Sequence, residues 1–128
     1  MNELNIKKVE ACMSWLMEGE SFTHSQSVSY LIDKLGELSV SMAFVNNQMA
    51  IAKKVLNDAK VKSYMSYGVK QNKLSPMLTK DLINSQVAPE QYDYDLCERC
   101  SRTIVHTIDA LRTAVSALKA EMQYAGIG

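Results

Sequence analysis

The stretch that decides the fold is "LIDKLGELSVSMAFVNNQMAIAKKVLNDA", residues 31–59. Apolar residues recur in it at alternating steps of four and three, as Leu31, Leu35, Leu38, Met42, Val45, Met49, Ala52, Leu56 and Ala59. This spacing is a heptad seam, which keeps one stripe of a helix against a neighbouring helix. Gly36 weakens the helix without changing the spacing. We therefore predict one helix over residues 23–67, which begins at a capping box of Thr23 and Gln26 and ends before Gly68.

A second seam lies near the C-terminus and predicts a helix over residues 89–124, opened by Pro89. The same alternation of four and three gives Cys97, Ser101, Ile104, Ile108, Leu111, Val115, Leu118 and Met122. Two shorter helices are expected beside these long ones. The apolar spacing before Gly19 predicts a helix over residues 2–18. Ser75 as a cap and Pro76 in the first turn predict another over residues 75–87.

The two long predicted helices dictate the overall architecture. At about 1.5 Å per residue they would be about 65 and 55 Å long, which exceeds the width of a compact domain of 128 residues. A short connection between them favours an antiparallel arrangement, seam against seam. We predict an all-α fold: a single domain over residues 1–128 that forms an elongated, coiled-coil-like hairpin, with a short N-terminal helix packed across one end and a short connecting helix.

Composition restricts the classes of partner. Lys and Arg (14) balance Asp and Glu (14), so the chain has no net charge to attract a polyanion, and any charge argument is local. No stretch is apolar and long enough to act as a signal peptide or membrane span, so we predict a cytoplasmic protein without membrane contact. The three cysteines are Cys12, Cys97 and Cys100, an odd number that indicates reduced thiols.

"CERC", residues 97–100, has the C-x-x-C spacing used for zinc and for redox chemistry. It lies within a helical pattern, and only Cys12, His24 and His106 remain as further ligands of the soft type. We therefore favour small buried side chains over a metal or redox site, and predict no metal and no cofactor.

The best local feature is a basic middle segment. Seven lysines and one acid, Asp58, occur between Lys53 and Lys80. Lysines contact phosphates and tyrosines stack on bases. The candidate nucleic-acid or nucleotide contacts are Lys53, Lys54, Lys60, Lys62, Tyr64, Tyr67, Lys70 and Lys73. The alternative is that lysines at a helix end simply complement the helix dipole.

A polar stripe on the last predicted helix is a candidate face for an anion or for an acidic side chain of a partner. It consists of Arg102, His106, Asp109 and Arg112. The alternative is a solvated face with pairs inside the stripe, which we favour. Asp93 and Asp95 are two residues apart and would point to different sides of a helix. No nucleophile has a base at motif spacing, so we predict that the protein is not an enzyme.

Apolar residues also lie beside the first seam. Phe44, Ile51 and Val55 recur at steps of seven and four and form a second stripe. Two adjacent stripes exceed what a single antiparallel neighbour buries. We therefore predict a homo-oligomer, a dimer or larger, in which this stripe packs against another chain.

The segment "ALRTAVSALKAEMQ", residues 110–123, carries a family resemblance. Its Arg112, Thr113, Ser116, Lys119 and Glu121 resemble the end of small all-helical bacteriophage and prophage accessory proteins, which occur beside single-strand annealing and replication genes. The resemblance implies a non-enzymatic phage-type protein in the host cytosol. Such a protein would act in DNA metabolism or against host defence by binding a protein partner of host or phage origin. The alternative function is a binder of nucleic acid or nucleotide.

Overall fold

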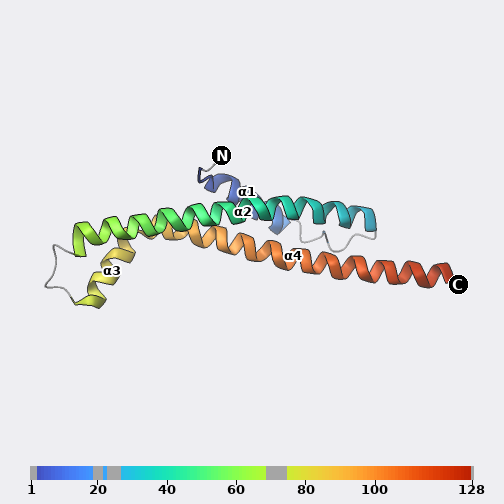
Figure 1. The fold of residues 1–128 in the computed structure, drawn as a ribbon. Coiled ribbons are helices and arrows are strands. Elements are labelled where there is room, and N and C mark those ends of the chain that lie inside the picture. The colour runs from blue at the N-terminus through green and yellow to red at the C-terminus, as the bar shows by residue number, and fades with distance from the viewer. Residues whose placement is uncertain (1–2, 19–21, 23–26, 69–74, 128) are drawn as a thin grey trace.

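The computed structural model describes residues 3–18, 22, 27–68 and 75–127. Within these residues the chain forms four α-helices and no strand: α1 (Ile6–Glu18), α2 (Val28–Ser63), α3 (Pro76–Gln86) and α4 (Ala88–Ile127). A π-helical turn, η2 (Tyr64–Gly68), extends α2. Figure 1 shows α2 and α4 as two long antiparallel rods, with α1 against them and α3 angled away at the end where α2 stops and α4 begins. The predicted all-α, elongated helical hairpin is confirmed.

The core of the hairpin is the pair of seams. Leu31, Leu38 and Val45 of α2 are completely buried, as are Ile104 and Leu111 of α4. Their packing is the main source of stability, because burying a Leu or Ile side chain contributes about 1.5–3 kcal/mol. One polar contact lies beside the seams: the Ser101 hydroxyl donates to Asn46 Oδ1 at 2.7 Å, across the two helices.

Helix α1 lies across the middle of the hairpin and not, as predicted, across one end, because its contacts are with the central parts of both long helices. A helix of 13 residues is marginal in isolation, so packing must hold it. Val9 and Leu16 provide that packing, since both are buried in the common core. At its C-terminal end the ring of Trp15 lies 5.3 Å from that of Phe22, and the ammonium of Lys34 lies near both rings.

The N-terminal end of α1 is held by a buried glutamine of α2. Gln48 is 2% exposed. Its Oε1 accepts from the backbone N–H of Asn5 at 2.6 Å, and its Nε2 donates to the carbonyl of Glu3 at 3.0 Å. Asn5 in turn caps the helix, because its side-chain oxygen accepts from the N–H of Lys8.

Several helix ends differ from those predicted. The first helix begins at Ile6 rather than residue 2, because Asn5 caps it. The predicted start of the first long helix, at Thr23 and Gln26, lies outside the described residues; α2 begins at Val28, with the Ser27 hydroxyl accepting from the N–H of Tyr30. Gly19, the predicted stop for the first helix, also lies outside them.

The connection between α3 and α4 is a single residue, Val87, which is 2% exposed. Ser75 caps α3 and Pro76 occupies its first turn, as predicted. Helix α4 begins at Ala88, one residue before the predicted start, and Pro89 lies in its first turn. Pro89 has no N–H and its ring clashes with a preceding helical carbonyl, which explains why the chain bends here instead of forming one helix.

Helix α4 is longer than predicted and extends past the start of α2. It continues to Ile127, and the contact between Ser101 and Asn46 places Val28, the first residue of α2, roughly opposite Lys119. Figure 1 shows the C-terminal end of α4 extending past the start of α2. The last seam residue, Met122, is 63% exposed as a consequence. We refer to residues 120–127 as the overhang.

Candidate functional site

The structure divides the predicted lysine site between different sides of α2. Lys53, Lys60 and Tyr64 recur at steps of seven and four, so they share one flank of the helix. Lys62 follows Lys53 by two and a half turns and lies on the opposite flank. Lys70 and Lys73 lie outside the described residues, and so does the side chain of Tyr67. The described part of the site is therefore a flank with two lysines and one tyrosine.

The charges of this flank are available to a ligand. Lys54 is paired with Asp58 at 3.4 Å, a fully solvated pair that contributes little to stability. Lys53 and Lys60 have no ion pair within the described residues. Tyr64 is 51% exposed. The flank can attract a phosphate, and its described residues include no glycine-rich cradle.

The predicted anion face is a continuous exposed stripe on α4. Arg102, His106, Asp109 and Arg112 are all exposed. Arg102 forms an ion pair with Glu98, one turn earlier on the same helix, so part of the stripe is neutralised internally. His106 and Arg112 remain available for a partner.

The predicted oligomer stripe is partly covered by α1. The ammonium of Lys8 lies 4.5 Å above the centre of the Phe44 ring, and Phe44 is half-buried in the core. Ile51 is half-buried, whereas Val55 is 41% exposed. Because α1 begins beside Gln48, the exposed part of the stripe is the segment of Ile51 and Val55 beyond the start of α1.

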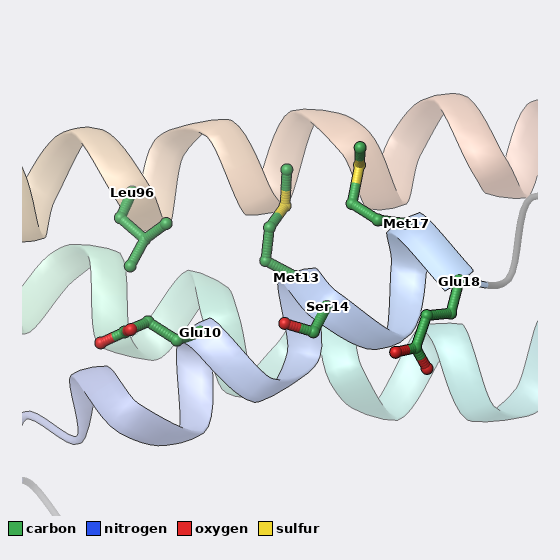
Figure 2. Close-up of a pocket in the computed structure, with 6 residues that line it drawn as sticks. All are labelled: Glu10, Met13, Ser14, Met17, Glu18 and Leu96. Carbon is green, nitrogen blue, oxygen red and sulfur yellow. The ribbon is translucent and has the colours of Figure 1, made fainter.

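Two grooves flank α1, and sequence reasoning missed both of them. Figure 2 shows the groove between α1 and α4, where Met13 and Met17 point toward α4 and Leu96 points back. Glu10 and Glu18 lie at its two ends. A groove of this kind needs the crossing of two elements distant in sequence, which periodicity along one helix does not reveal.

The α1–α4 groove is acidic. The carboxyl group of Asp93, in α4, has its pKa raised by partial burial and by the nearby charges of Glu90 and Glu10. Glu10 and Glu18 line the groove, and their carboxylates repel a further anion. The groove therefore favours an apolar or basic side chain over a phosphate.

The second groove lies between α1 and α2 and is mostly apolar. Trp15, Val40 and Phe44 line it, together with Lys8 and Cys12. Val40 is 73% exposed at the outer side. The groove brings one of the three cysteines to the surface.

The other two cysteines are in the core. Cys97 and Cys100 are completely buried. Burial, together with the charge of Asp93, raises the pKa of Cys97 to about 11. Burial and the neighbouring Cys12 raise the pKa of Cys100 to about 12. Both thiols are therefore protonated at neutral pH. Across the described chain, no group of three or more His, Cys, Asp or Glu side chains is placed to hold a metal ion.

No protein-family model matches the chain, and no curated protein or solved structure compared with it gives a match. Among the helices described, none is both long enough and apolar enough to cross a membrane. The functional argument therefore rests on the surfaces themselves.

Proposed function

We propose that this protein is a non-enzymatic helical interaction protein, which self-associates and binds a protein partner through apolar surface that its own chain leaves uncovered. The observation that carries the proposal is the overhang. There the heptad seam of α4 continues past Val28, the first residue of α2, so no helix of the described chain faces its last residue, Met122, which is 63% exposed. A heptad seam is a surface that another helix covers by knobs-into-holes packing.

Further uncovered apolar residues support the proposal. Val55 of the stripe and Val40 beside α1 are exposed, as are Val61 of α2 and Tyr92 of α4. They are spread along a hairpin about 60 Å long, at roughly 1.5 Å per residue. Exposed apolar positions distributed along two long helices suit a helical partner better than a small molecule, which is bound in an enclosed pocket.

The biological setting that we propose follows from the resemblance of residues 110–123. That segment includes part of the overhang, so the resemblance and the uncovered seam occur at the same end of α4. We infer a phage-type accessory protein in the host cytoplasm. It would act in DNA metabolism or against host defence by binding a protein of host or phage origin.

The test is affinity capture from infected or lysogenic cells with matched variants. Met122→Glu places a charge in the seam. Ala120→Glu places the same charge on the opposite, exposed face of the overhang. We expect the wild type and Ala120→Glu to capture the same partner and Met122→Glu to lose it. Capture that is equal for all three forms would contradict a partner site on the overhang.

Nucleic-acid or nucleotide binding is the second candidate, favoured by the flank of Lys53, Lys60 and Tyr64. Its test is titration with single-stranded and double-stranded DNA and RNA at two salt concentrations. Salt-sensitive binding that is lost in the double variant Lys53→Glu, Lys60→Glu and kept in Lys62→Glu would support it. Binding that is equally strong in both variants would contradict a site on this flank.

A further inference from the structure

Two of the three thiols meet where α1 crosses the hairpin. Cys12 belongs to α1 and Cys100 to α4, and the two thiols are neighbours at one core cluster, close enough for Cys12 to raise the pKa of Cys100. Cys100 is completely buried, and Cys12 packs against the same core cluster. The contact therefore brings together two sulfur atoms from helices that are far apart in the sequence.

Only one member of this pair can be reached from solvent. Cys12 is partly exposed and lines the apolar groove between α1 and α2, beside Trp15 and Phe44. Cys100 lies behind it and has no exposed surface. An oxidant of a few atoms can enter through the groove and meet Cys12 first.

We propose that Cys12 is a site of oxidation by peroxides and that Cys100 converts the oxidised side chain into a disulfide that joins α1 to α4. The accessible thiol thus reacts with the peroxide, and the buried thiol reacts with the oxidised Cys12. This arrangement, a surface cysteine beside a second cysteine within contact, is the one that allows reversible oxidation.

The reaction occurs in two balanced steps. The Cys12 sulfur attacks one oxygen of the peroxide, the O–O bond breaks, and Cys12 sulfenic acid forms with release of water or an alcohol. The Cys100 sulfur then attacks the Cys12 sulfur; the S–O bond breaks, and the hydroxyl group leaves as water with the proton of Cys100. Two thiols are oxidised and one peroxide is reduced. Because burial raises the pKa of Cys100 to about 12, the second step is slow at neutral pH, and the sulfenic acid persists long enough to be trapped.

The disulfide would change how α1 is held. In the reduced chain α1 depends on the burial of Val9 and Leu16 and on the hydrogen bonds of Gln48. A covalent link in the middle of the helix adds a constraint that survives local opening of those contacts. Oxidation would therefore hold α1 on the hairpin and limit how far the grooves on its two sides can widen.

The experiment exposes the reduced full chain to graded hydrogen peroxide, blocks the remaining thiols under denaturing conditions and measures mass. Before blocking we expect a loss of about 2 Da within a single chain; after blocking we expect peptides linked through Cys12 and Cys100, and the blocking group on Cys97. Amide exchange in α1 should slow by about tenfold or more in the oxidised form. Dimedone added with the peroxide should label Cys12.

Three variants separate this proposal from its rivals. Cys97→Ala should form the disulfide normally, whereas Cys12→Ser and Cys100→Ala should not. A link between Cys97 and Cys100, a link between chains only, or no loss of mass in the wild type would overturn the proposal. If Cys100→Ala does not fold, dimedone labelling of the wild type decides: a label on Cys97 or Cys100 instead of Cys12 would also overturn it.

Discussion

Gln48 shows what a single residue contributes at the centre of this fold. It lies beside the apolar seam of α2, is buried, and makes two hydrogen bonds to the backbone of Glu3 and Asn5. Buried polar groups persist where they satisfy other buried polar groups. Gln48 therefore specifies where α1 begins on the hairpin.

Replacement of Gln48 by leucine tests this role. The variant keeps the volume but leaves the N–H of Asn5 and the carbonyl of Glu3 without partners. We expect the free energy of unfolding to fall by about 1–3 kcal/mol, with faster amide exchange in α1 than in the wild type. Asn47→Leu, at the neighbouring exposed position, is the control and should change stability by less than about 0.5 kcal/mol. Equal stability of the two variants would contradict the anchoring role.

Replacement of Gly36 should have the opposite effect and stabilise the fold. It lies in the interior of α2, is exposed, and a Cβ added there would meet nothing within 4 Å. Alanine reduces the entropy that the unfolded chain loses on folding and has the higher helix propensity. We expect Gly36→Ala to raise the free energy of unfolding by about 0.5–1 kcal/mol, measured by urea denaturation. A decrease would mean that glycine is needed at this position for contact with another molecule.

The environment of Asp93 should make the free energy of unfolding depend on pH. Its carboxyl pKa is raised by partial burial and by Glu90 and Glu10, so its charged form destabilises the fold above that pKa and its neutral form does not. We expect Asp93→Asn to be more stable than the wild type at neutral pH, with the difference shrinking as the pH falls and Asp93 becomes protonated. Denaturation at several pH values measures it. A difference that is constant with pH would contradict the assignment.

At the scale of the elements, the burial of the α4 seam changes along the helix. Where α2 faces α4 the seam is buried, and where α2 is absent the same spacing is exposed, as Leu111 and Met122 illustrate. Helix α1, by contrast, has no long seam and depends on a few buried residues and on its cap. The stability of a helix here follows from what covers it.

A pair of alanine variants measures this contrast within α4. Leu111→Ala removes a completely buried side chain and should lower the free energy of unfolding by about 2–5 kcal/mol. Met122→Ala removes an exposed one and should change it by less than about 0.5 kcal/mol at a protein concentration where the chain is monomeric. Similar losses for both variants would show that the overhang is covered in the state measured.

The long helices and their seams could be predicted from the sequence because periodicity is a local property of the chain. Leu31 to Leu56 and Cys97 to Val115 follow the predicted spacing and are buried at most seam positions. The start of α2 was misplaced because Ser27 offers the same capping chemistry as Thr23. The Gln48 anchor, the contact of Cys12 with Cys100 and the grooves beside α1 could not be predicted, since each depends on how distant segments cross.

The sequence predicted which candidate interaction residues are exposed better than which of them share one face of a helix. Their roles stay predictions. The stripe of Arg102, His106, Asp109 and Arg112 is exposed as one face, because residues spaced by three and four share a side of a helix. The lysines were grouped by their density along the chain, and density does not determine direction: Lys53 and Lys62 lie on opposite flanks of α2. Phe44 was expected to be available to another chain, and α1 lies over it.

At the scale of the whole molecule, two of the apolar surfaces that a single chain leaves uncovered are those we propose for self-association. One is the overhang at the C-terminal end of α4, and the other is the segment of Ile51 and Val55 beyond the start of α1. A second copy of the chain could cover both, since a two-fold axis brings identical surfaces together. This self-association is the central claim of the proposed function.

Light scattering after size-exclusion chromatography at micromolar concentration tests that claim most directly. We predict a mass of twice 14.3 kDa or a larger closed multiple for the wild type. Val55→Glu or Met122→Glu should shift it toward the monomer. The charge controls Asn57→Glu and Ala120→Glu, on the opposite exposed faces of the same helices, should not. A mass of 14.3 kDa that persists as the wild type is concentrated would contradict self-association through these surfaces.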